Sequence, residues 1–121
     1  GTHDVVAASM QAWSTSNPDP SFMTLNFNFE ITPPLYDLGF EVQYRRGHAD
    51  AWNSYTCYPG YSPICPIDPF RRTYKQIRSY SPCEYRKFQW RARVFNYGDN
   101  GFGSGCWSPV KTFVAYCITE S

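Results

Sequence analysis

The sequence predicts an all-β protein, a seven-stranded antiparallel β-sandwich. Hydrophobic and polar residues alternate with a period of two in several segments, which is the spacing of a strand that buries one face. No window keeps helical periodicity over three turns. Ten prolines and eight glycines divide the chain into short segments, as turns do between strands.

The clearest strand is predicted at residues 22–31. Every second residue of this segment is apolar: Met23, Leu25, Phe27, Phe29 and Ile31. Segments that contain proline, residues 17–20 and 32–34, are expected to end this strand on both sides. The odd-numbered side chains are therefore expected to face the core.

Six further segments are expected to be strands, some by alternation and others by their content of β-forming residues. They are residues 5–13, 38–46, 51–57, 73–79, 88–96 and 110–116. The alternating strands each have a polar face, so we expect every sheet to be covered on one side only. The expected core consists of Leu25, Phe27 or Phe29, Ile31, Val42, Tyr44, Phe88, Trp90, Ala92, Val94 and Val114.

Length and composition indicate one folded domain over residues 1–121. The chain has 121 residues, of which 42% are hydrophobic and 17% charged, and such a composition excludes a disordered chain. No run of 18 apolar residues is present, so no membrane span is expected. Residues 1–4 are expected to be a tail or a cloning remnant. The net charge of +1 identifies no partner.

Positive charge is concentrated between residues 71 and 93, where eight lysines and arginines face one acid, Glu84. Such a cluster is either a solvated strand face or a surface for a polyanion such as heparin. The residues expected on this basic face are Arg71, Arg72, Lys75, Arg78, Arg91 and Arg93.

Five cysteines in a chain of this length indicate an oxidising, extracellular compartment and disulfide bonds. No metal site is expected, because Cys57 and Cys65 are too far apart for a zinc-ligand pair and His48 is the one realistic imidazole. Catalysis and cofactors are not expected either, since no base is placed near a cysteine and no phosphate-binding glycine loop opens a helix.

Two segments resemble strands of fibronectin type III domains, especially those of cytokine receptors. Residues 40–45, FEVQYR, resemble their strand C, and residues 88–96, FQWRARVFN, resemble their strand F. Residues 101–109, GFGSGCWSP, resemble the F-to-G hairpin. This resemblance spans about residues 10–116 and implies a fibronectin type III-like sandwich.

The signature Trp-Ser-x-Trp-Ser of haematopoietic receptors is half present. CWS at residues 106–108 fits its second half, whereas SG at residues 104–105 replaces the first Trp-Ser. Those receptors stack strand F arginines on the tryptophan, which implies that Arg91 and Arg93 stack on Trp107, at roughly 0.5–2 kcal/mol. The alternative is that Trp107 only covers a sheet edge.

The topology that the resemblance implies also places the cysteines. Cys83 precedes strand F and Cys117 follows strand G at the same end of the sandwich, so we expect a disulfide bond between them. The cysteine spacing in class II cytokine receptors implies a second bond, Cys57–Cys65, and leaves Cys106 as a free or intermolecular thiol. The alternative second bond is Cys65–Cys106.

We expect an extracellular protein-binding module, either a cytokine-receptor-like ectodomain or a soluble decoy. Its partner would be a protein ligand such as a helical cytokine, or a neighbouring receptor domain; nucleic acid is not expected. Two alternatives stay open: a general adhesion module of a larger surface protein, and a polyanion-binding module. Loop aromatics are typical of protein-binding surfaces. The expected ligand-binding residues are Tyr58, Tyr61, Ile64, Phe70, Tyr97, Asp99, Phe102 and Trp107.

Overall fold

The computed structural model describes residues 4–16, 23–32, 38–57, 72–79, 86–96 and 103–115. These residues are almost entirely β-structure, with one short 3₁₀ turn, η1 (Ala7–Ser9). Their strands are β1 (Asp4–Val5), β2 (Gln11–Ser16), β3 (Met23–Phe29), β4 (Ile31–Thr32), β5 (Leu38–Arg45), β6 (Asn53–Cys57), β7 (Arg72–Ser79), β8 (Arg86–Asn96), β9 (Gly103–Ser104) and β10 (Lys111–Ala115). A search of the described residues finds no helix with the length and apolarity needed to span a membrane.

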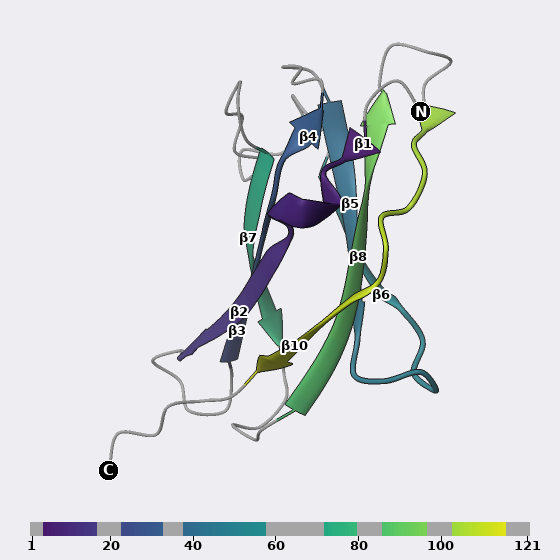
Figure 1. Cartoon of the computed structure of the whole chain (residues 1–121). Coiled ribbons are helices and arrows are strands. Elements are labelled where there is room, and N and C mark those ends of the chain that lie inside the picture. Colours follow the sequence, from purple (N-terminus) through teal and green to yellow (C-terminus); the bar gives the residue numbers. More distant parts are fainter. Residues whose placement is uncertain are drawn as a thin grey trace.

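The strands form antiparallel sheets in two layers (Figure 1). One layer contains the three-stranded sheet β2-β3-β7. The other contains β10-β8-β5-β6, with β9 paired to β8. A small pair, β1 with β4, joins Asp4 to Thr32, so Asp4 belongs to the fold and not to the tail expected for residues 1–4.

The core lies between the two larger sheets and is rich in aromatic rings. Phe27 of β3 lies 5.0 Å from Trp90 of β8, measured between ring centroids. Phe29 meets Phe40 of β5 edge to face at 5.5 Å. Such tilted and edge-to-face pairs are the favoured geometries of aromatic rings. The rings of β3 therefore join its sheet to the opposite one.

The period-two pattern predicts most of this core correctly. The expected strands at residues 38–46, 51–57, 73–79, 88–96 and 110–116 are confirmed to within two residues at each end. Phe40 is buried although the expected core left it out. Tyr44 is half-buried, and burial raises the pKa of its hydroxyl. The buried residues that the pattern predicted are Leu25, Phe27, Phe29, Ile31, Val42, Phe88, Trp90, Ala92 and Val94.

The expected burial of Val114 in β10 is wrong. Phe113 lies opposite Phe88 in the register, and their rings stack at 5.5 Å with an interplanar angle of 21°. Because alternate residues point to opposite faces of a strand, this pairing turns Val114 outward and buries Ala115 instead. Val114 is half-buried.

The single strand expected at residues 5–13 is also wrong, because η1 divides it. The Ser9 hydroxyl donates to the Val6 carbonyl at 2.6 Å and accepts from the Glu30 amide at 2.8 Å. The Val6 amide donates to the Glu30 carbonyl at 2.9 Å. These bonds offer the backbone an alternative to the strand ladder, and they also end β3 before Glu30.

The disulfide expected between Cys83 and Cys117 stays a prediction, and the pairing of β8 with β10 is the nearest described feature. Its register extends to Arg86 opposite Ala115. Cys83 precedes Arg86 by three residues and Cys117 follows Ala115 by two, although both cysteines lie outside the described residues. We therefore expect a Cys83–Cys117 cross-link in a peptide map of the non-reduced protein.

That bond would close a loop of about 35 residues and stabilise the fold by roughly 3–4 kcal/mol. Selective reduction should lower the denaturation midpoint accordingly. A map that links Cys83 to any other cysteine contradicts the prediction.

Candidate functional site

The most organised polar feature of the described residues lies on the outer face of the β5–β8 pair. Residues 40, 42 and 44 of β5 pack toward the core, so the odd-numbered residues between them point outward. In three directly opposite pairs an arginine Nε donates to a side-chain oxygen on the other strand. The pairs are Arg93 with Glu41 at 2.7 Å, Arg91 with Gln43 at 2.9 Å, and Arg45 with Gln89 at 2.9 Å.

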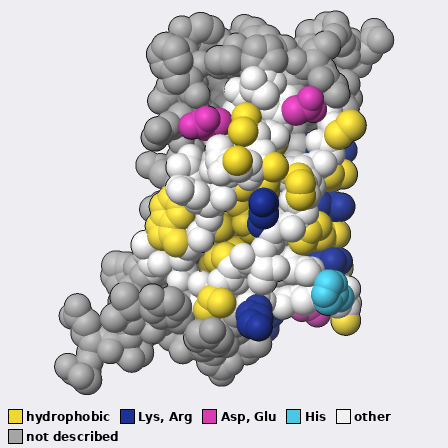
Figure 2. Space-filling view, viewed as in Figure 1, with side chains coloured by type: hydrophobic (Ala, Val, Ile, Leu, Met, Phe, Trp, Pro, Cys, Tyr) yellow, Lys and Arg dark blue, Asp and Glu magenta, His cyan; other side chains and the backbone are white. Residues whose placement is uncertain are grey.

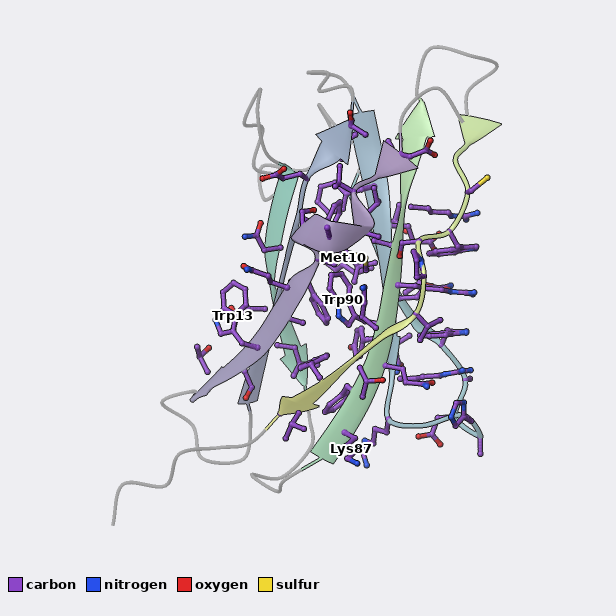
Figure 3. All side chains as sticks on the ribbon, in the orientation of Figure 1. Met10, Trp13, Lys87 and Trp90 are labelled. Atoms are coloured by element: carbon purple, nitrogen blue, oxygen red, sulfur yellow. The ribbon has the colours of Figure 1, made fainter. Side chains whose placement is uncertain are left out.

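Two tryptophans are inserted between these arginines. The Trp107 ring lies between Arg93 and Arg91, whose guanidinium carbons are 4.4 Å and 4.2 Å from its centroid. The Trp52 ring lies between Arg91 and Arg45, at 4.6 Å and 4.0 Å. We call Arg45, Trp52, Arg91, Trp107 and Arg93 the arginine–tryptophan ladder. Figure 3 shows the column of side chains that it forms beside β8, on the side away from Trp90.

The spacing of a β-strand explains why rings and guanidinium groups alternate. Residues two apart on a strand are separated by about 6.8 Å. An aromatic ring in van der Waals contact on both faces needs about 7 Å. When arginines occupy every second position of a strand, the space between two successive guanidinium groups is therefore wide enough for one aromatic ring. The expected stacking of Arg91 and Arg93 on Trp107 is confirmed, and Trp107 does more than cover an edge.

Trp107 is held in place by backbone pairing with β8. The Gly105 amide donates to the Val94 carbonyl at 2.7 Å, and the Ser108 amide donates to the Ala92 carbonyl at 2.8 Å. The Ser108 hydroxyl in turn accepts from the Ala92 amide at 2.9 Å. Residues 105–108 thus run along β8 as an extension of the sheet, which brings the indole over the arginines.

Trp52 reaches the ladder from the turn between β5 and β6. The turn is closed by a hydrogen bond from the Asp50 amide to the Gly47 carbonyl, at 3.1 Å. At the start of β6, the Asn53 amide side chain donates to the Tyr44 carbonyl at 3.3 Å. The turn therefore returns the chain to the sheet with Trp52 beside Arg45.

The ladder concentrates positive charge in a partly desolvated place. An ion pair joins Arg93 to Glu41, with Nη2 and Oε1 2.7 Å apart. The pKa of Arg91 is lowered, mainly by burial and then by the like charges of Arg45 and Arg93, while Glu41 acts in the opposite direction. The outer face of this sheet is therefore not the fully solvated face expected from the sequence, since Glu41 is buried.

The structure places one of the expected ligand-binding residues, Trp107, and covers both faces of its ring with guanidinium groups. The other seven lie outside the described residues: Tyr58, Tyr61, Ile64, Phe70, Tyr97, Asp99 and Phe102. Cys106 is a free, exposed thiol. Cys65 lies outside the description, so the pairing expected for Cys57 stays a prediction.

The residues expected to form one basic face are divided between two sheets. Arg91 and Arg93 lie on β8, in the sheet that carries the ladder. Arg72, Lys75 and Arg78 lie on β7 in the opposite sheet. Arg71 lies outside the described residues. The cluster seen in the sequence is therefore not one continuous strand face.

Two members of the ladder, Arg45 and Trp52, were not identified from the sequence. Arg45 could have been found, because the alternation at residues 38–46 puts it on the polar side of its strand. Trp52 stands outside any periodic segment, and no local pattern indicates that its ring returns to the sheet. In the described part of the chain, no three His, Cys, Asp or Glu side chains gather as metal ligands.

No family model and no curated protein matches the chain. Among solved structures, it is similar to the crystal structure of a family 76 glycoside hydrolase from a bovine Bacteroides thetaiotaomicron strain, with 14% identity and a TM-score of 0.50. The alignment covers 93% of this chain but only 20% of the hydrolase chain. The likeness concerns the fold alone.

Trp107→Ala should destabilise the protein by about 2–3 kcal/mol, because it removes two cation–π contacts and leaves a gap between two guanidinium groups. Trp13→Ala is the matched control, since Trp13 is 42% exposed on β2 (Figure 3), and should cost at most about 1 kcal/mol. Urea denaturation measures both. Equal losses for the two variants contradict a stabilising ladder.

Ser108→Ala should cost about 1–3 kcal/mol, because it leaves the buried Ala92 amide without its hydroxyl acceptor. Ser54→Ala removes a hydroxyl that accepts from Gln43 at an exposed position and should change stability by less than about 0.5 kcal/mol. The comparison uses the same denaturation assay. A Ser108 variant as stable as the Ser54 variant shows that the hydroxyl is dispensable.

Proposed function

We propose that this chain is a fibronectin type III-like module of the cytokine-receptor kind and that it binds a protein ligand outside the cell. The observation that carries the proposal is the arginine–tryptophan ladder. It uses Arg91, Arg93 and Trp107, which are the residues through which the sequence resembles the strand F and Trp-Ser signature of those receptors. Ser108 supports the same comparison, because it fixes Trp107 to β8.

The chemistry of the ladder favours recognition over catalysis. Arginine stays protonated near neutral pH, and an indole has no titratable group in that range. The hydrogen bonds of the ladder also hold its side chains against neighbouring strands, away from any arrangement of nucleophile and base. We therefore propose a binding module that is not an enzyme. The name of the similar hydrolase does not argue otherwise, because only 20% of that chain is aligned.

The proposed ligand-binding segments, residues 58–71 and 97–102, continue from the same end of the ladder-bearing sheet. In the register, Phe40 of β5 lies opposite Cys57, the last residue of β6, and opposite Val94, near the end of β8. Strands β6 and β8 therefore finish at the same end of the sheet, on either side of β5. This supports the proposal that aromatic residues of both segments contribute to one binding surface, as hot spots of protein interfaces often do.

The proposal is tested by binding to a panel of purified four-helix cytokines. We expect the immobilised chain to bind at least one member, and we expect Phe102→Ala and Tyr61→Ala to remove that binding without unfolding the chain. Trp13→Ala is the control variant and should bind as the wild type does. Surface plasmon resonance measures the affinities and circular dichroism checks the fold.

Two results contradict the proposal. One is that no member of the panel binds. The other is that Phe102→Ala and Tyr61→Ala lower stability and leave binding unchanged. That result is expected of a general adhesion module, in which these aromatic side chains would pack within the domain itself.

A further inference from the structure

The arginine–tryptophan ladder carries more positive charge than its own partners neutralise. Among the described residues, its three arginines face one carboxylate, that of Glu41, which is paired with Arg93. Arg45 and Arg91 each donate Nε to a neutral glutamine oxygen. Their Nη groups make no further hydrogen bond to the described residues. Two guanidinium groups are thus left with donors for an external acceptor.

These two guanidinium groups lie close together on either side of Trp52. Their central carbons are no more than about 8.6 Å apart, the sum of their distances of 4.0 Å and 4.6 Å from the ring centroid. At this separation like charges repel, and the lowered pKa of Arg91 reflects that repulsion in addition to burial. An anion that contacts both groups would relieve it.

The positive column continues beyond the ladder to Lys87. Lys87 is exposed and shares the outward direction of Arg91 and Arg93, because all three are odd-numbered residues of β8. From Lys87 to Arg93 the strand rises by about 20 Å. Figure 2 shows Lys and Arg side chains along the right-hand edge of the molecule, above the histidine side chain drawn in cyan, and Figure 3 labels Lys87 at the lower end of β8. The neighbouring turn contains one further basic residue, Arg46, and one acidic residue, Asp50.

The stacking also limits which anions can be recognised. Trp52 and Trp107 have both ring faces covered by guanidinium groups. Single-stranded nucleic acid is held largely by bases stacked on free aromatic faces, which the ladder does not offer. Recognition must therefore use the outer edges of the guanidinium groups, whose paired donors match tetrahedral oxyanions.

We propose that Lys87, Arg45 and Arg91 form a binding site for a sulfated polysaccharide that runs along the outer face of the β5–β8 pair. The sulfate groups would accept hydrogen bonds from the Nη groups on either side of Trp52, and Lys87 would extend the contact along the strand. This site differs from the basic face expected from the sequence, which extended onto β7. It does not depend on the receptor function proposed above.

The test measures binding of a heparin octasaccharide and its desulfated counterpart by isothermal titration calorimetry at several salt concentrations. We expect heparin to bind and the desulfated chain not to bind. Lys87→Gln should weaken binding and lower the slope of log Kd against log salt by about 1, as the loss of one phosphate-binding lysine does with nucleic acid. Arg45→Gln should weaken it further.

Arg46→Gln is the matched control, because it removes an exposed charge beside the column and should leave the affinity unchanged. Thermal denaturation identifies any variant that fails to fold. Lys87 takes no part in the stacking, so Lys87→Gln should fold normally and still test the binding site even if Arg45→Gln does not fold.

Four results overturn the proposal: no binding of heparin, equal binding of the desulfated chain, a Lys87→Gln affinity equal to that of the wild type, and equal binding of a DNA duplex of the same length. Loss of binding in an Arg72→Gln/Arg78→Gln variant, with Lys87→Gln unaffected, places the site on β7 and overturns it as well.

Discussion

The pairing of β5 with β8 determines both the core and the outer face of this sheet. The register runs from Leu38 opposite Asn96 to Arg45 opposite Gln89. Since successive residues of a strand point to opposite faces, the same register sends Val42 and Ala92 into the core and sets each arginine opposite its acceptor. A slip of one residue would exchange the two faces and bury arginines among the aromatic rings. The core and the ladder therefore specify the same register.

Arginine is suited to this arrangement in a way that lysine is not. Its guanidinium group is planar, so both faces of Arg91 can lie against indole rings while its edge donates to Gln43. A lysine ammonium is a compact charge without a flat face, and its donors are not fixed in a plane. The ladder thus requires three arginines with strand spacing as well as two rings.

The sequence was informative where alternation was strict. Strands β3, β5 and β8 could be predicted, with their buried residues, because their apolar side chains recur at every second position. In β10 the apolar residues Phe113, Val114 and Ala115 are consecutive, so the pattern allows two registers. The stacking of Phe113 on Phe88, a contact between strands distant in sequence, selects one of them.

Tertiary contacts likewise explain what the sequence could not indicate about the ladder. The position of Trp107 could be predicted, because a known motif surrounds it. Trp52 follows a turn, and only the finished sheet brings its ring against Arg45 and Arg91. The strand break at η1 has the same origin, since the Ser9 hydroxyl bonds to Glu30, far along the chain.

In the polysaccharide-binding site that we propose, the stacking of the ladder would also prepare a binding surface. Stacking fixes Arg45 and Arg91 before any ligand arrives, so binding there costs less side-chain entropy than at freely rotating lysines. The same stacking covers the indole faces and leaves only the edges of the charged groups accessible. The rigidity of the ladder and its proposed selectivity for oxyanions therefore follow from one arrangement. The closest carboxylate, Glu41, cannot neutralise the whole column, because it is buried beside Arg93 at one end.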